Sequence, residues 1–156
     1  MSLDGEIEFF LRRMRNDDLP EVLAIEHQCF SHPWPENTFR GEIQNEGLSH
    51  PMVALEKTTG RLIGYVIYWM VLDEVQINNV AVHPDFRRRH IAEAMMNRIL
   101  EDARTKGGMY AVLEVRLSNV AARTLYEKKL GFVYLDIRTA YYTNPTEDAL
   151  VLGLPL

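Results

Sequence analysis

Hydrophobic positions recur along the chain with two spacings, every second residue in some stretches and every third or fourth in others. The first spacing is typical of half-buried strands, and the second is typical of amphipathic helices. Alternation predicts strands at residues 6–14, 52–56, 61–72, 75–82, 110–117, 132–142 and 148–154, and the helical spacing predicts helices at 19–30, 36–46, 89–106 and 120–129. This order predicts an α+β fold in which helices flank one central sheet that is mixed but mostly antiparallel.

The stretch from residue 75 to residue 100 places a buried strand, a cationic turn and a helix in immediate succession. Alternation along the strand is broken at Asn78-Asn79, which a bulge or a local splay of the strand would explain. His83-Pro84-Asp85 ends the strand, and the helical spacing resumes at Arg89. The first helical turn is therefore predicted to include the residues Arg87-Arg88-Arg89-His90-Ile91-Ala92.

A helix start with three arginines is suited to binding an anion. The first turn of a helix exposes unpaired backbone N–H groups and the positive end of the helix dipole. Arg87, Arg88 and Arg89 add positive charge there, so a phosphate group fits this turn. For a charge run in isolation, solvation of a helix start is the more frequent role. The buried strand directly in front favours phosphate binding.

Composition limits the class of protein. A chain of 156 residues with 47% hydrophobic and 25% charged residues predicts one domain over residues 1–156. The net charge of −5 argues against a nucleic-acid partner, which would need a basic surface. The single Cys29 excludes an internal disulfide framework. With no signal peptide and no apolar run of membrane-spanning length, we expect a cytoplasmic protein without a membrane partner.

Several polar residues lie where chemistry is possible. Glu114 is a carboxylate in the middle of a strand, and on periodicity alone an exposed strand residue is the simpler reading. Asn119 caps the following helix, and Tyr126 lies seven residues later, about two α-helical turns, so both are predicted to face the same side. His27, His32, His50 and His83 have no metal-ligand spacing, so no metal is expected.

Three stretches resemble the GNAT family of N-acetyltransferases. Residues 87–92 match the family's pyrophosphate loop, R/Q-x-x-G-x-G/A, except that His90 stands where the family usually has glycine. The second stretch is CFSHPW at 29–34, and the third is LEVR at 113–116, continuing through NVAA at 119–122 to LYEKKLGF at 125–132. The third is the most specific, because its spacing of carboxylate, cap Asn and helix Tyr is hard to obtain by chance. Within the family the chain is most similar to the N-terminal acetyltransferases typified by the ribosomal-protein alanine acetyltransferase.

The resemblance implies acetyl-CoA as cosubstrate and a division of roles in direct transfer to an amine. Glu114 would take the ammonium proton, and Tyr126 would donate to the departing sulfur. An unperturbed tyrosine pKa of about 10 and a thiol pKa of about 8.5 make that donation nearly balanced. The implied cosubstrate-binding residues are Val80, Ala81, Val82, Arg87, Arg88, Arg89, His90, Ile91, Ala92, Glu93, Asn119 and Tyr126.

The resemblance also implies that Phe30, Pro33 and Trp34 bind the acceptor. An aromatic plug that fixes the turn between two helices explains Trp34 equally well. The expected partner is the N-terminus of a protein, with a ribosomal protein as one candidate, and the expected assembly is a monomer or a weak dimer.

Two rival functions stay open at the level of sequence. One is a GNAT enzyme that acts on lysine, a polyamine or another small amine. At pH 7 roughly a tenth of an α-amino group is neutral, against well under a thousandth of a free lysine, which favours the N-terminal amine. The other is a non-catalytic acyl-CoA-binding module, against which the presence of both Glu114 and Tyr126 argues.

His90 is the position where the chain leaves the family pattern. A bulky residue at positive φ is strained. We therefore expect His90 at negative φ, within regular helix.

Overall fold

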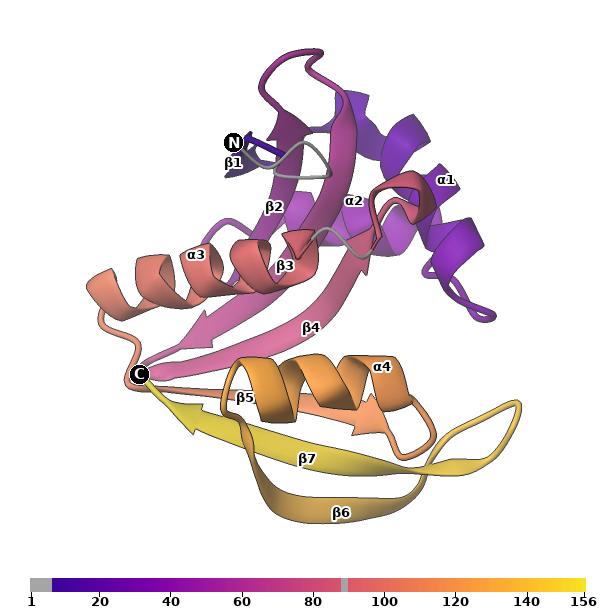
Figure 1. Ribbon diagram of the computed structural model, residues 1–156, viewed down its shortest axis with the longest axis vertical. Helices are drawn as coiled ribbons and strands as arrows, with labels where there is room; N and C mark the ends of the chain where they lie inside the picture. Colours follow the sequence, from indigo (N-terminus) through magenta and orange to yellow (C-terminus); the bar gives the residue numbers. More distant parts are fainter. Residues whose placement is uncertain (1–6, 88–89) are drawn as a thin grey trace. The chain divides into compact units, whose positions relative to one another are not determined.

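A computed structural model describes residues 7–87 and 90–156 (Figure 1). Its strands are β1 (Phe9–Arg13), β2 (Ser49–Glu56), β3 (Leu62–Val71), β4 (Glu74–Val82), β5 (Tyr110–Arg116), β6 (Val133–Tyr142) and β7 (Glu147–Pro155). Its helices are α1 (Leu19–Cys29), α2 (Glu36–Gln44), α3 (Ile91–Thr105) and α4 (Val120–Arg123), which continues as a π-helix, η3 (Thr124–Lys129). Short 3₁₀ turns lie at Asn16–Asp18 and Pro84–Phe86. Each predicted strand and helix is present.

The strands form one sheet with the hydrogen-bonded order β1-β2-β3-β4-β5-β7-β6. β4 and β5 are parallel, with pairs from Glu74↔Tyr110 to Ile77↔Leu113. β1 with β2, β5 with β7, and β6 with β7 are antiparallel. The predicted α+β class with a mixed, mostly antiparallel sheet is therefore confirmed.

The chain divides into two compact units, and the first comprises residues 1–68 and 79–96. Its core lies where α1 and α2 meet β2 and β3, and fully buried side chains there include Val22, Ile25, Phe39, Val53 and Tyr65. Arg12 fixes the start of α1, because its two terminal nitrogens donate to the two carboxylate oxygens of Asp18 at 2.7 and 2.8 Å.

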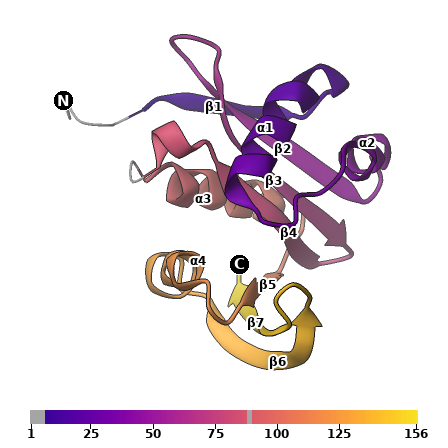
Figure 2. The same cartoon turned by 90° about the vertical axis from the view of Figure 1, so that its right-hand side faces the viewer.

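The second unit comprises residues 69–78 and 97–156. It contains the part of the sheet that is formed by β5, β7 and β6 (Figure 2). Buried Tyr126, from η3, packs against buried Phe132 with ring centroids 5.9 Å apart. The helical segment is thereby anchored beside the sheet.

Burial along β4 differs from the prediction. Val75, Ile77, Asn79 and Ala81 are all buried, and the residues between them are more exposed. Burial therefore alternates without a break at Asn78-Asn79, whereas the pairing of β4 with β5 ends at Ile77↔Leu113, directly before the residues where a bulge or a local splay was predicted. Asn79 occupies a core position because its side-chain amide donates to the buried carboxylate of Glu26 at 2.9 Å, and a satisfied amide is tolerated in a core.

The start of α3 also differs. The helix begins at Ile91, and Arg87 has extended backbone angles, φ −68° and ψ 157°. His90 has a φ of 58°, in the left-handed region, so the expectation of negative φ and regular helix is wrong. Arg88 and Arg89 lie outside the described residues.

Across residues 7–87 and 90–156, no helix combines the length and the apolar character needed to cross a membrane.

Candidate functional site

Glu114 lies in the middle of β5 on its less buried face. Ala111, Leu113 and Val115 are buried, whereas Glu114 lies on the alternate face and its side chain is 30% exposed. The Nη1 atom of Arg138, on β6, donates to Glu114 Oε1 at 2.6 Å. The carboxylate is thus accessible and held in a fixed orientation by an arginine from another strand.

Two tyrosines adjoin this carboxylate. The Arg138 guanidinium lies 4.8 Å from the ring centroid of Tyr141. A hydrogen bond to Glu114, together with partial burial, raises the pKa of Tyr141. Burial and the nearby charge of Glu114 raise the pKa of Tyr142 to about 12. Both phenols are protonated at neutral pH, and the carboxylate accepts hydrogen bonds from Arg138 and Tyr141.

Tyr126, the predicted proton donor, lies in the interior of the second unit and not in water. It is buried, and burial followed by the proximity of Tyr142 raises its pKa well above the ordinary value. The pKa of Tyr126 therefore lies further above the roughly 8.5 of a thiol than the pKa of an unperturbed tyrosine does, and proton donation by Tyr126 to the departing sulfur stays a prediction. Tyr126 also lies in a π-helical segment, so α-helical periodicity does not fix its direction relative to Asn119.

Asn119 caps the helix, as predicted. Its side-chain oxygen accepts a hydrogen bond from the N–H of Ala122 at 3.1 Å. This bond satisfies one of the donors that a helix start leaves unpaired. A structural role for Asn119 is therefore established, and its role toward acetyl-CoA stays a prediction.

The segment from His90 to Glu93 has the geometry of an anion site. The N–H of Ala94 donates to the carbonyl of His90 at 3.0 Å, so the N–H groups of Ile91, Ala92 and Glu93 precede the first intrahelical bond. A left-handed residue directly before the helix is a position for which glycine is suited, and His90 occupies it. Its side chain is 80% exposed. The residues present therefore fit a pyrophosphate group at a helix start.

Other predicted cosubstrate residues lie in the same unit. Ala81 is buried, and Val80 and Val82 are half-buried on β4. The thiol of Cys29 donates to the carbonyl of Val82 at 3.5 Å, and Arg87 Nη2 donates to the same sulfur at 3.2 Å. These contacts bring the end of α1, the end of β4 and the exposed Arg87 together.

The predicted acceptor residues lie in the segment between α1 and α2. Phe30 and Trp34 pack against the core of the first unit, and Pro33 is half-buried. The ring of Trp34 lies 5.4 Å from that of Phe39. The aromatic plug that the sequence left open is therefore present, and acceptor binding by these residues stays a prediction.

Glu26 was not predicted from sequence. It is 1% exposed, and its carboxylate accepts from the hydroxyl of Tyr65 at 2.5 Å, from Asn79 Nδ2 at 2.9 Å and from the backbone N–H of Trp34 at 2.9 Å. The available signal was its place on the apolar face of α1, beside Ile25 and four residues after Val22. A charged residue on such a face is rare unless it has partners.

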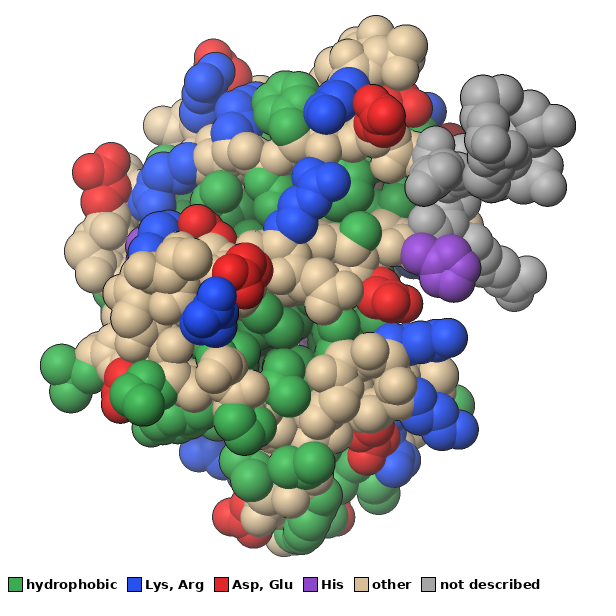
Figure 3. Space-filling view, turned by 60° about the vertical axis from the view of Figure 1, so that its left-hand side comes forward, with side chains coloured by type: hydrophobic (Ala, Val, Ile, Leu, Met, Phe, Trp, Pro, Cys, Tyr) green, Lys and Arg blue, Asp and Glu red, His purple; other side chains and the backbone are tan. Residues whose placement is uncertain are grey.

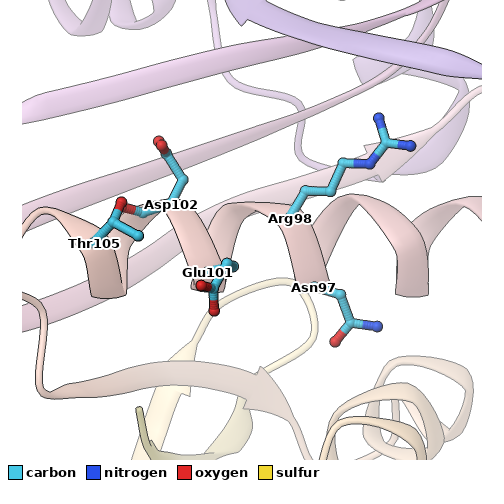
Figure 4. Close-up of a pocket in the computed structure, with 5 residues that line it drawn as sticks. All are labelled: Asn97, Arg98, Glu101, Asp102 and Thr105. Atoms are coloured by element: carbon cyan, nitrogen blue, oxygen red, sulfur yellow. The ribbon is translucent and has the colours of Figure 1, made fainter.

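A surface hollow of about 430 Å³ is lined by residues of α3, namely Asn97, Arg98, Glu101, Asp102 and Thr105 (Figure 4). Glu101 pairs with Arg104 at 2.8 Å and Asp102 with Lys106 at 2.9 Å. None of the predicted site residues lines this hollow. It has the character of a solvated helix face.

Hydrophobic side chains gather on β6. Val133, Tyr134 and Leu135 are each more than half exposed. Figure 3 shows hydrophobic side chains gathered at the bottom of the view, where a few acidic side chains accompany them. The edge strand that supplies Arg138 therefore also presents an apolar surface.

Comparison with known proteins agrees with this geometry. The model of the acetyltransferase (GNAT) family matches residues 19–132. The chain is 37% identical to a putative ribosomal protein bS18-alanine N-acetyltransferase of Bacillus subtilis, over 94% of this chain and 95% of that protein. It is 35% identical to the Escherichia coli ribosomal protein bS18-alanine N-acetyltransferase, over 92% of this chain and 95% of that one.

The crystal structure of the ribosomal-protein-S18-alanine N-acetyltransferase from Escherichia coli superposes with a TM-score of 0.84 at 33% identity, over 95% of this chain and 94% of that chain. A family model that matches most of the chain and relatives of this identity lead to one conclusion. The chain belongs to the GNAT family, and it is an acetyltransferase that uses acetyl-CoA.

Proposed function

We propose that this enzyme acetylates the N-terminal α-amino group of a protein by direct attack in a ternary complex, and that its acceptor is a ribosomal protein that begins with alanine. The relatives at 35% and 37% identity are named for this activity on ribosomal protein bS18. The likeness extends over more than nine-tenths of the chain in both cases. It therefore includes the segment between α1 and α2 as well as the strands around Glu114.

The observation that carries the mechanism is the accessible, oriented carboxylate of Glu114. An ionised carboxylate has about four acceptor positions, of which Arg138 occupies one at Oε1 and the hydroxyl of Tyr141 occupies another. The remaining positions can accept a proton from the incoming ammonium, directly or through one water. The neutral amine then attacks the thioester carbonyl, a C–N bond forms and the C–S bond breaks.

The departing thiolate takes up a proton from the hydroxyl of Tyr126, which regains one from the attacking nitrogen, directly or through water, as the amide forms. Before the reaction Tyr126 is protonated at neutral pH, because burial raises its pKa. A protonated donor stabilises negative charge on sulfur as the C–S bond breaks.

The cosubstrate is assigned to two groups of residues. The N-terminal turn of α3, with Arg87, His90, Ile91, Ala92 and Glu93, holds the pyrophosphate. The backbone of β4 from Val80 to Val82 pairs with the pantetheine arm, and Asn119 supplies a further hydrogen bond. Arg88 and Arg89 belong to the same assignment by sequence. Phe30, Pro33 and Trp34 are assigned to the acceptor.

A peptide library tests the acceptor class. Peptides that vary in their first two residues are incubated with the enzyme and acetyl-CoA, and products are located by mass spectrometry. Acetylation of the α-amino group of alanine-starting peptides is expected. Matched peptides with a blocked N-terminus and an internal lysine form the control, and acetylation of these alone would assign the enzyme to lysine instead.

Substitution of the proposed base tests the mechanism. Glu114→Gln keeps the size and a hydrogen-bond acceptor for Arg138 but cannot take up a proton. We expect kcat to fall roughly a hundredfold, the range of general-base catalysis, while the Kd for acetyl-CoA stays unchanged. Glu127→Gln is the matched control, because that glutamate is similarly exposed, at 32%, and pairs with Arg123. Near-normal turnover of Glu114→Gln between pH 6 and 9 would remove Glu114 from the mechanism.

A further inference from the structure

The carboxylate of Glu26 connects parts of the first unit that are distant in sequence. Its Oε1 accepts from Tyr65 on β3 and from Asn79 on β4, and its Oε2 accepts from the N–H of Trp34. All three donors are neutral groups, and each of the two carboxylate oxygens accepts at least one hydrogen bond. A buried carboxylate is stable only while its donors stay in hydrogen-bonding position, because a buried polar group without partners is costly.

The three attachments are not equivalent. Tyr65 and Asn79 lie in strands, whose backbone ladders position them independently of Glu26. Residues 30–35 have no regular secondary structure. The hydrogen bond to the N–H of Trp34 therefore matters most for this segment.

An aromatic series leads from the same segment back to Glu26. Trp34 packs against Phe39 at 5.4 Å, and Phe39 meets Tyr65 edge-on at 5.9 Å. The hydroxyl of Tyr65 then donates to Glu26. The side chain and the backbone of Trp34 are thus fixed by one connected set of contacts, centred on a carboxylate that is removed from solvent.

We propose that Glu26 is a positioning residue for the acceptor: through the N–H of Trp34, it holds the segment 30–35 in the conformation that receives the incoming N-terminus. This inference rests on the proposed function for the identity of the acceptor. Glu26 does not touch the reacting atoms. It acts by fixing backbone that would otherwise adopt several conformations, which lowers the entropic cost of binding a peptide.

Glu26→Met is the principal test, because methionine has a similar length and no carboxylate oxygen. We expect the KM for an alanine-starting peptide to rise about tenfold, the ratio expected for loss of one hydrogen bond to a charged acceptor. The KM for acetyl-CoA should change less than about twofold, because the ladder holds β4. Glu26→Gln should have a smaller effect, since its amide oxygen can still accept from Trp34.

Val22→Ala is the matched control for a general loss of stability. Val22 is fully buried on the same helix, and its side chain has no polar atom that could join the hydrogen bonds of the Glu26 carboxylate. This variant should lower Tm and leave both KM values unchanged. An equal rise in peptide KM in Val22→Ala, or no rise in Glu26→Met, would overturn the proposal.

Fluorescence provides a readout that needs no turnover. The chain has two tryptophans, so Trp69→Phe leaves Trp34 as the single reporter. In that background, Glu26→Met should shift the Trp34 emission to longer wavelength and increase its quenching by acrylamide, and Val22→Ala should do neither. Unchanged emission in Glu26→Met would show that Glu26 does not hold the segment. If the wild-type enzyme acetylated no peptide, the proposed function would fail while this measurement still decided the role of Glu26.

Discussion

At the scale of single residues, His90 shows how a backbone requirement can override side-chain preference. Its φ of 58° is a conformation that costs most non-glycine residues about 1–3 kcal/mol, although histidine tolerates it better than most. The side chain is 80% exposed, so few contacts of its own compensate. The strained residue lies where the backbone enters α3, directly before the N–H groups assigned to the pyrophosphate.

Two substitutions at this position separate backbone strain from side-chain chemistry. Glycine removes the strain but adds about 0.5–1 kcal/mol of unfolded-state entropy, so His90→Gly should be as stable as the wild type or up to about 1 kcal/mol more stable. His90→Val should be destabilised by about 1–2 kcal/mol, because a β-branched residue is least suited to positive φ. Urea unfolding measures both.

The Kd for acetyl-CoA of His90→Gly completes this test. It should equal the wild-type Kd, because the backbone N–H groups remain in place.

The stability of His90→Val decides whether residue 90 is left-handed. If this variant is as stable as the wild type in urea, the left-handed assignment is wrong and the sequence-based expectation of helix at this position is restored.

The local sequence predicted some site residues and could not predict others. It placed Glu114 in mid-strand and Asn119 at a helix cap, because both positions follow from periodicity and capping within a few residues. Arg138 lies 24 residues from Glu114, and nothing in the spacing shows that β6 brings the two together. Glu26 is hidden for a similar reason, since its donors come from 8 to 53 residues away.

At the scale of elements, a close approach between β3, β4 and α3 stabilises the strand assigned to the pantetheine arm. A Cβ atom on Gly64 of β3 would lie 2.7 Å from the carbonyl oxygen of Ala81 and 3.0 Å from the Sδ of Met95. Met95 can change rotamer, whereas the carbonyl of Ala81 is fixed in the strand. Packing therefore requires glycine at position 64, and a larger residue there would displace Ala81, which is a predicted cosubstrate-binding residue.

A pair of glycine substitutions tests this contact. Gly64→Ala should destabilise the protein by about 1–3 kcal/mol through overpacking, and it should raise the KM for acetyl-CoA, because Ala81 must move. Gly41→Ala is the matched control, since nothing lies within 4 Å of a Cβ there and the residue is inside α2. It should stabilise the protein by about 0.5–1 kcal/mol. A stable Gly64→Ala variant with unchanged KM would show that β3 and β4 are not in this close contact.

Two differences between the sequence-based interpretation and the structure, the burial of Asn79 and the start of α3, have one cause. Polar Asn79 was taken to interrupt the alternation of β4, and the arginines near residue 88 were taken to begin α3. Both interpretations inferred the position of a residue from the polarity of its side chain alone. In the folded chain, Asn79 is buried because Glu26 accepts its hydrogen bond, and the helix starts later because His90 adopts a left-handed turn.

At the scale of the whole molecule, the sequence predicted each strand, the four helical segments and the fold class, but not the order of strands in the sheet. β7 lies between β5 and β6, so the last strand of the chain pairs with two earlier ones. Periodicity reports which face of a strand is buried. Which strands pair depends on contacts between distant residues, and such contacts leave no local signal.

Buried tyrosines in both units make the stability of the whole molecule sensitive to alkaline pH. Burial, followed by the charge of Glu26, raises the pKa of Tyr65, and burial followed by Tyr142 raises that of Tyr126. Burial and then Glu114 raise the pKa of Tyr142 to about 12. Between about pH 10, the pKa in the unfolded state, and its higher folded pKa, such a phenol is protonated in the folded state and ionised in the unfolded state. Its contribution to stability is full below pH 10 and is lost as the pH rises toward the folded pKa.

We therefore expect the free energy of unfolding to fall steadily between pH 10 and pH 11.5, and Tyr142→Phe to make that fall shallower. Phenylalanine cannot ionise, and it keeps the ring over which the Arg116 guanidinium lies at 4.4 Å, so the cation–π contact survives. Urea unfolding at pH 8, 10 and 11.5 measures the slope. Tyr134→Phe is the control, because Tyr134 is 59% exposed and the substitution should leave the slope as it is in the wild type. Identical slopes for Tyr142→Phe and the wild type would mean that Tyr142 ionises equally in both states and that the surroundings of Glu114 are open to solvent.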